Sequence, residues 1–257
     1  MTDRKASTAA ADLAPLHPTA LTAGAWRSVG ATFASLWPLW IVWSLYGAGT
    51  VYWQAAAIGQ GASPRRLSYM AISSFGAAVM TGAATRAFLG GATPWWRLDA
   101  RQGRFIILAG ASNFLLQTPY LIPTVDRAHQ TAANAGGIIL LGLGQLFAVL
   151  VLAWAFIRLS LWPIGQLAEG RLMTARRSWR QMHGAFWPYL GAMILASGGP
   201  LIVTASLVYQ HQINGAQWAL FAQAPFAALA GLITAALGVE IYRVRVTAPD
   251  TMADVFD

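Results

Sequence analysis

Six long runs of apolar residues constrain the fold of this chain more than any other feature of its sequence. They cover residues 36–58, 67–89, 105–125, 136–162, 186–209 and 218–242. Each run has close to or above the ~20 residues that a helix needs to cross ~30 Å of hydrocarbon. The runs do not alternate apolar and polar residues as membrane strands do. Since backbone groups in lipid must be hydrogen-bonded internally, the sequence predicts an all-α membrane protein with six transmembrane helices.

The scarcity of charge supports the same class. Only 10% of the 257 residues are charged, whereas soluble domains carry about 25%. The formal net charge of +8 raises the question of nucleic-acid binding. The basic residues lie at the ends of the apolar runs and form no continuous stripe, so no nucleic-acid partner is expected. We expect a disordered tail over residues 1–17, one six-helix bundle over 18–245 and an acidic tail over 246–257.

Basic residues are distributed unevenly between the two sides of this predicted bundle. With the N-terminus in the cytoplasm, the cytoplasmic side receives Arg4, Lys5, Arg27, Arg86, Arg97, Arg101, Arg104, Arg158, Arg171, Arg176, Arg177, Arg180, Arg243 and Arg245. The outer side receives only Arg65, Arg66 and Arg127. Cytoplasmic loops are enriched in Lys and Arg, so both termini are predicted to be cytoplasmic. The near-exclusive use of arginine is typical of a GC-rich bacterial genome, and we expect the bacterial inner membrane.

Similar segments precede the first and fifth predicted helices. At a constant offset of 153 residues, Trp26, Val29 and Phe33 correspond to Trp179, Met182 and Phe186, and a fainter third copy surrounds Trp96. Each copy precedes a predicted hairpin of two membrane helices, and the hairpins end near Arg86, Arg158 and Arg243. These observations favour three repeated hairpins. The alternative is that Trp and Arg simply mark membrane interfaces, as they commonly do.

The second copy has the pattern of an amphipathic helix on the cytoplasmic surface. Trp179, Met182 and Phe186 share one face, and basic residues occupy the opposite flank. We predict a belt that binds anionic lipid, an acidic partner protein or a second copy of the chain. Its residues are Arg171, Arg176, Arg177, Trp179, Arg180 and His183. The alternative is that the belt only fixes topology and helix tilt.

Three short motifs carry a resemblance to a known group. They are residues 156–163 (FIRLSLWP), 178–186 (SWRQMHGAF) and 94–101 (PWWRLDAR). Together they resemble the bacterial membrane domains associated with glycerophosphodiester phosphodiesterases and the stand-alone relatives of those domains. His183 departs from the group, which often has Arg or Gly at that position. Since the sequence contains no phosphodiesterase catalytic domain, the resemblance implies a fold and a compartment but no reaction.

Motifs for catalysis and metal binding are lacking in the sequence. There is no His-Glu-x-x-His, no Gly-x-Ser-x-Gly and no cysteine. The four histidines fall on opposite sides of the predicted membrane, so neither a metal nor another cofactor is expected. Glu240 is the one acidic residue inside a predicted membrane helix, and its spacing predicts an (i, i+3) ion pair with Arg243.

Three amide side chains lie within predicted membrane helices. Asn113 and Gln117 are one turn apart in the third helix, and Gln145 is in the fourth. Such amides usually bond across helices as packing contacts. The sequence therefore favours a non-enzymatic scaffold or accessory subunit that organises lipids or partner proteins. The alternative is a small transporter or channel-like carrier whose polar path these amides line.

Overall fold

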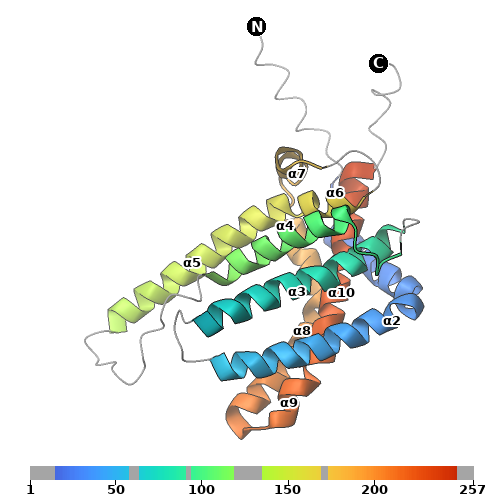
Figure 1. Ribbon diagram of the computed structural model, residues 1–257. Coiled ribbons are helices and arrows are strands. Elements are labelled where there is room, and N and C mark those ends of the chain that lie inside the picture. Colours follow the sequence, from blue (N-terminus) through green and yellow to red (C-terminus); the bar gives the residue numbers. More distant parts are fainter. Residues whose placement is uncertain (1–14, 58–63, 91–93, 119–134, 169–172, 248–257) are drawn as a thin grey trace, which may run out of the picture.

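The computed structural model describes residues 15–57, 64–90, 94–118, 135–168 and 173–247, and every regular element in these ranges is a helix (Figure 1). The elements are α2 (Pro18–Ala57), α3 (Pro64–Leu89), α4 (Ala100–Gln117), α5 (Ala135–Leu159), α6 (Leu161–Leu167), α7 (Ala175–Gln181), α8 (Phe186–Asn214), α9 (Gln217–Ala222), α10 (Ala224–Tyr242) and the π-helical turn η4 (Arg243–Thr247). The predicted all-α class is confirmed. The predicted tails, over residues 1–17 and 246–257, lie mostly outside the described residues.

Five helical segments of the described chain are long and apolar enough to cross a membrane. They are Pro18–Trp53, Pro64–Leu89, Gly142–Leu167, Phe186–His211 and Gln217–Val246. This is the make-up of a multi-pass membrane protein. The predicted third span corresponds to α4, which has 18 residues and is not among the five. Residues 119–125, the remainder of that predicted span, lie outside the described residues.

The two copies of the Trp-containing segment fold differently. Around Trp26 the segment continues without a break into α2, whose 40 residues extend about 60 Å, twice the ~30 Å hydrocarbon thickness. Around Trp179 it forms the separate short helix α7, because Gly184 has a φ of 71° and ends the segment before α8 begins. Ala31 stands at the corresponding place in the first copy. Alanine favours a continuous helix, whereas glycine readily adopts positive φ.

The centre of the bundle is α10. It contacts α2, α3, α6 and α8, and side chains from all around it are buried, including those of Leu232, Ile233 and Leu237. A helix that is apolar on every face is expected to be buried on every face. The second extensive contact joins α3 to α4, where Gly82 allows the Phe105 ring to approach the α3 backbone closely. Among the described helices, α4 therefore packs chiefly on α3 rather than on α5, its partner in the predicted hairpin.

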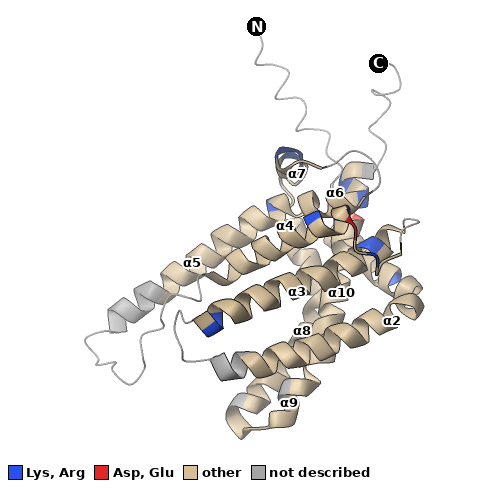
Figure 2. Cartoon of the chain, viewed as in Figure 1, with Lys and Arg blue, Asp and Glu red and all other residues tan. Residues whose placement is uncertain are grey.

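Most of the described basic residues gather at one end of the bundle (Figure 2). This end, called the basic end below, contains the start of α2, the α3–α4 connection, the end of α5, α6, α7 and the end of α10. Arg65 and Arg66, at the start of α3, lie at the opposite end. The chain therefore places charge at helix termini and leaves the long helical faces apolar.

Candidate functional site

Helix α7 presents basic side chains outward from the basic end. Thr174 caps the helix by accepting a hydrogen bond from the Arg177 amide at 3.2 Å. Arg176, Arg180 and His183 are exposed, Arg177 is partly exposed, and Ser178 and Met182 are buried. The helix is thus two-sided, with guanidinium groups on the outer flank. Arg171, also assigned to the belt from the sequence, lies outside the described residues.

The inner side of α7 is attached to the end of α5 by Arg158. Its guanidinium carbon lies 5.2 Å from the Trp154 ring centroid and 5.3 Å from that of Trp179. Arg158 Nη1 also donates to the Trp179 carbonyl at 3.2 Å, and Ser178 Oγ donates to the Arg158 carbonyl at 2.9 Å. Trp179 therefore belongs to the attachment of the helix, whereas its neighbouring arginines remain outside.

A second arginine, Arg86, holds the α3–α4 connection through a pair with Asp99 that the sequence analysis did not predict. Arg86 is 5% exposed; its guanidinium donates to the Arg97 carbonyl at 2.6 Å and to Asp99 Oδ1 at 2.7 Å. Asp99 caps α4 by accepting from the Gln102 amide at 2.8 Å. The signal was present in the sequence: an Asp followed by Gln three residues later resembles a capping box.

The surroundings of Asp99 have two opposite effects on the pKa of its carboxyl. Burial alone would raise its pKa, but the hydrogen bonds from the Gln102 amide and the Arg86 guanidinium, with the charge of Arg86, hold the pKa below its ordinary value. The ionised form is thereby stabilised. Asp99 thus acts as a fixed negative charge that joins the end of α3 to the start of α4.

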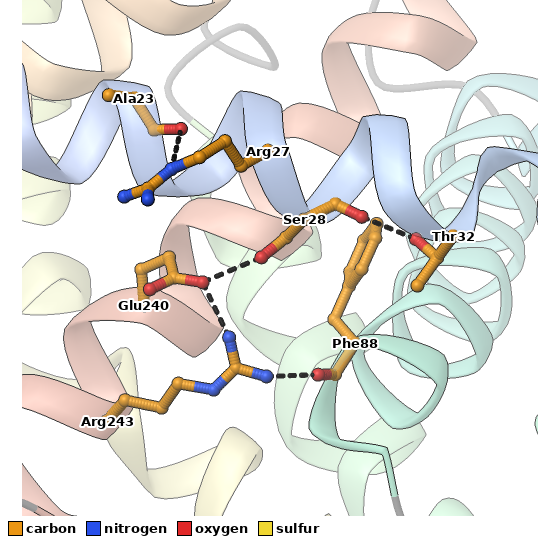
Figure 3. A network of polar contacts seen from close by, with 7 residues as sticks. All are labelled: Ala23, Arg27, Ser28, Thr32, Phe88, Glu240 and Arg243. Atoms are coloured by element: carbon orange, nitrogen blue, oxygen red, sulfur yellow. Dashed lines mark hydrogen bonds and ion pairs between the residues drawn. The ribbon is translucent and has the colours of Figure 1, made fainter.

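A third arginine closes the bundle between its first and last helices (Figure 3). The predicted pair of Glu240 and Arg243 is confirmed, with Arg243 Nη1 2.6 Å from Glu240 Oε1. Ser28 Oγ of α2 donates to the same oxygen at 2.7 Å, and Arg243 Nη2 donates to the Phe88 carbonyl at 2.6 Å. Gly24 leaves room for this carboxylate, since a Cβ there would lie 3.1 Å from Glu240 Oε2. The network connects α2, α3 and α10.

Arg86, Arg158 and Arg243 share one arrangement. Each stands at or just after the end of a membrane-length helix, and each donates to a backbone carbonyl of another segment. These are the three arginines whose spacing suggested the repeat. Hydrogen bonds from a guanidinium suit the carbonyls left unpaired at turns and helix ends. The three arginines hold the basic end together, although Arg243 is itself exposed, and they are separate from Arg176 and Arg180 on the outer flank of α7.

The three predicted amides occupy different surroundings. Gln117 donates from Nε2 to Ser74 Oγ at 2.9 Å and so connects α4 to α3. Asn113 is partly exposed and lines a cavity that is partly open to the outside of the bundle, and Gln145 is partly exposed on α5. Within the described residues, Gln117 therefore serves as a packing contact while Asn113 faces open space. The two amides, one turn apart, thus have different neighbours, and the path they were predicted to line stays a prediction.

The described residues contain no group of three His, Cys, Asp or Glu side chains placed to hold a metal ion. No model of a protein family matches the chain, and no curated protein and no solved structure is similar to it. The resemblance to the phosphodiesterase-associated membrane domains therefore stays a prediction. What the described structure offers is a basic end with three internally bonded arginines and an outward-facing basic helix.

Proposed function

We propose that this chain is a non-enzymatic membrane scaffold or accessory protein that binds anionic phospholipid headgroups at its basic end. The supporting observation is the two-sided helix α7. Its inner side is held by Arg158 and Met182, and its outer side exposes Arg176 and Arg180. Rigid attachment of the helix reduces the entropy lost on binding. Guanidinium groups bind phosphate through paired hydrogen bonds, so a phospholipid headgroup suits this surface.

The proposed setting is a bacterial inner membrane with the basic end in the cytoplasm. The asymmetry in the positions of Lys and Arg supports this orientation. In it, α4 would cross the membrane as a sixth span, because its 18 residues extend about 27 Å and approach the ~30 Å hydrocarbon thickness. The cytoplasmic leaflet is also the one that carries negative surface potential, so lipid binding and orientation agree.

Single cysteines test this orientation, because the chain has no native cysteine. Ser68→Cys and Asn214→Cys, at the end opposite the basic end, should react with an impermeant maleimide added to intact cells. Ala100→Cys and His183→Cys should react only after the membrane is opened. Thr118→Cys reports on α4: labelling from outside supports six spans, and protection until lysis contradicts them.

Lipid binding is tested with two triple variants that each remove three positive charges from the basic end. The test variant carries Arg176→Gln, Arg177→Gln and Arg180→Gln. The control carries Arg97→Gln, Arg101→Gln and Arg104→Gln, which are exposed but not on α7. The measurement is native mass spectrometry of the purified protein with phosphatidylglycerol, and with phosphatidylcholine as the reference lipid.

We expect the α7 variant to bind phosphatidylglycerol roughly fivefold more weakly for each charge removed, since each basic residue near an anionic surface contributes about 1 kcal/mol. The control should retain most of its binding. Equal losses in both variants would show that net charge, not α7, attracts the lipid. Unchanged binding in the α7 variant, together with loss of a co-purifying acidic protein, would replace the lipid with a protein partner.

A further inference from the structure

A cavity of about 240 Å³, partly open to the outside of the bundle, lies between α3, α4, α5, α6, α8 and α10. Its apolar wall includes the rings of Phe105 and Phe156 and the side chains of Leu116 and Ile164. Among the described residues that line it, none carries a charged side chain. The cavity is thus separate from the arginine-rich surface of α7 and has a different chemical character.

Three hydroxyl groups in the cavity wall are already hydrogen-bonded to their own helices. Ser112 Oγ donates to the Leu108 carbonyl at 2.7 Å, and Ser160 Oγ donates to the Ile157 carbonyl at 2.8 Å. Thr234 Oγ1 donates to the Ala230 carbonyl at 2.8 Å. This is the usual arrangement of Ser and Thr in membrane helices, and it uses the donor of each hydroxyl, which can then only accept a hydrogen bond from a ligand.

Four other polar side chains in the wall form no hydrogen bond with any described residue. They are Thr81, Thr85, Asn113 and Tyr189, from α3, α4 and α8. Polar groups in a membrane interior are costly unless they are hydrogen-bonded. Together they supply an amide and three hydroxyls, so they can both donate and accept. These four side chains therefore leave hydrogen-bonding groups available to a molecule in the cavity.

We propose that this cavity binds a small uncharged polyol. Each hydroxyl of a polyol both donates and accepts, which matches the amide of Asn113 and the hydroxyls of Tyr189, Thr81 and Thr85. The carbon–hydrogen face of the same molecule packs against the rings of Phe105 and Phe156. An ion is disfavoured because no charged side chain lines the cavity to offset its desolvation. The volume is below the range of about 300–1,000 Å³ that holds drug-sized ligands, which favours a short polyol.

Saturation-transfer difference NMR on the full chain in nanodiscs tests this site. The probes are glycerol and erythritol, with glycerate as a charged molecule of similar size and with empty nanodiscs as the background. The variants are Asn113→Leu and Tyr189→Phe, of which the second removes only a hydroxyl group. Ser112→Ala is the matched control, because its hydroxyl lines the same cavity but already donates to Leu108.

We expect saturation transfer to both polyols and none to glycerate in the unaltered protein. Each test variant should weaken polyol binding roughly fivefold to tenfold, the effect of one lost hydrogen bond in a desolvated site, and Ser112→Ala should leave it unchanged. No transfer to either polyol would show that the cavity holds water only and would overturn the proposal. Equal transfer to glycerate, or binding that survives in Tyr189→Phe and Asn113→Leu, would also overturn it. Since none of these residues belongs to α7, the result is independent of the lipid proposal.

Discussion

The α3–α4 connection and the attachment of α7 to α5 are each held by one arginine, but the chemistry differs. Arg86 is buried and faces a carboxylate, that of Asp99 at 2.7 Å. Arg158 is only partly buried and lies between two indole rings, with centroids 5.2 and 5.3 Å away. Both also donate to a backbone carbonyl. The difference follows from burial: a guanidinium with almost no exposure needs a countercharge, whereas a partly solvated one can be held by ring faces.

The two connections should differ in how much stability they lose when one partner is replaced. The α3–α4 connection depends on a charged pair, so loss of either partner leaves an unpaired charge in a poorly solvated place. The attachment of α7 depends on geometry and contact area, so loss of one contact weakens it only gradually. The first connection fixes two helices of the bundle, and the second holds the helix that carries the proposed lipid-binding arginines.

The largest expected effect comes from removing the buried charge. Arg86→Gln leaves Asp99 without its countercharge and the Arg97 carbonyl without its donor. We expect a loss of about 3 kcal/mol in the free energy of unfolding, at the lower end for breaking a buried pair, because Asp99 is partly exposed. The measurement is denaturant-induced unfolding in detergent micelles. Arg104→Gln, an exposed arginine at the same end, should change stability by less than about 0.5 kcal/mol.

An intermediate effect is expected at the second arginine. Arg158→Lys keeps the charge but loses the planar group that contacts both rings. We expect a loss of about 1 kcal/mol, since a lysine forms weaker contacts with aromatic faces and cannot reproduce the fixed geometry of the guanidinium. The same unfolding assay measures it. If Arg158→Lys proved as damaging as Arg86→Gln, the distinction between the two connections would be wrong.

The sequence predicted the helical class, the approximate position of five membrane-length helices and the Glu240–Arg243 pair. Apolar runs and (i, i+3) spacing are local patterns, so they can be recognised in the sequence without knowledge of the packing. The sequence did not predict that α2 would be one helix of 40 residues, or that α4 would pack mainly on α3. Both depend on contacts between distant residues, such as Gly82 with Phe105.

For the candidate site, the sequence identified the basic flank of α7. It did not show which arginines are bonded within the protein and which are exposed. Arg86, Arg158 and Arg180 look alike in sequence, each close to an apolar run and to a Trp. Only the positions of Asp99 and of the two indole rings distinguish the bonded arginines from the exposed one. Asn113 and Gln117 were likewise grouped by spacing, and their different surroundings follow from where Ser74 and the cavity lie.

The smallest effect expected is a dependence on pH that only one of the two connections should show. Because the pKa of Asp99 is lowered in the folded protein, its contribution to stability is fully present above the pKa of the unfolded chain, about 3.9. That contribution is lost as the pH falls through the folded pKa, when the carboxyl becomes protonated and the pair with Arg86 weakens.

Unfolding measured between pH 6 and pH 3 should therefore show a steeper loss of stability for the unaltered protein than for Asp99→Asn. The difference between the two should be confined to the region near and below pH 4, because above it the carboxyl is ionised in both the folded and the unfolded chain. Arg158→Lys serves as the second comparison. The contacts that hold α7 among the described residues include no carboxyl, so the pH profile of this variant should parallel that of the unaltered protein. A profile for Asp99→Asn as steep as that of the unaltered protein would show that other carboxyl groups govern the acid response. The α3–α4 connection would then be stabilised mainly by the hydrogen bond from Arg86 to the Arg97 carbonyl. Arg86 and Arg158 would in that case act alike, each through a backbone carbonyl.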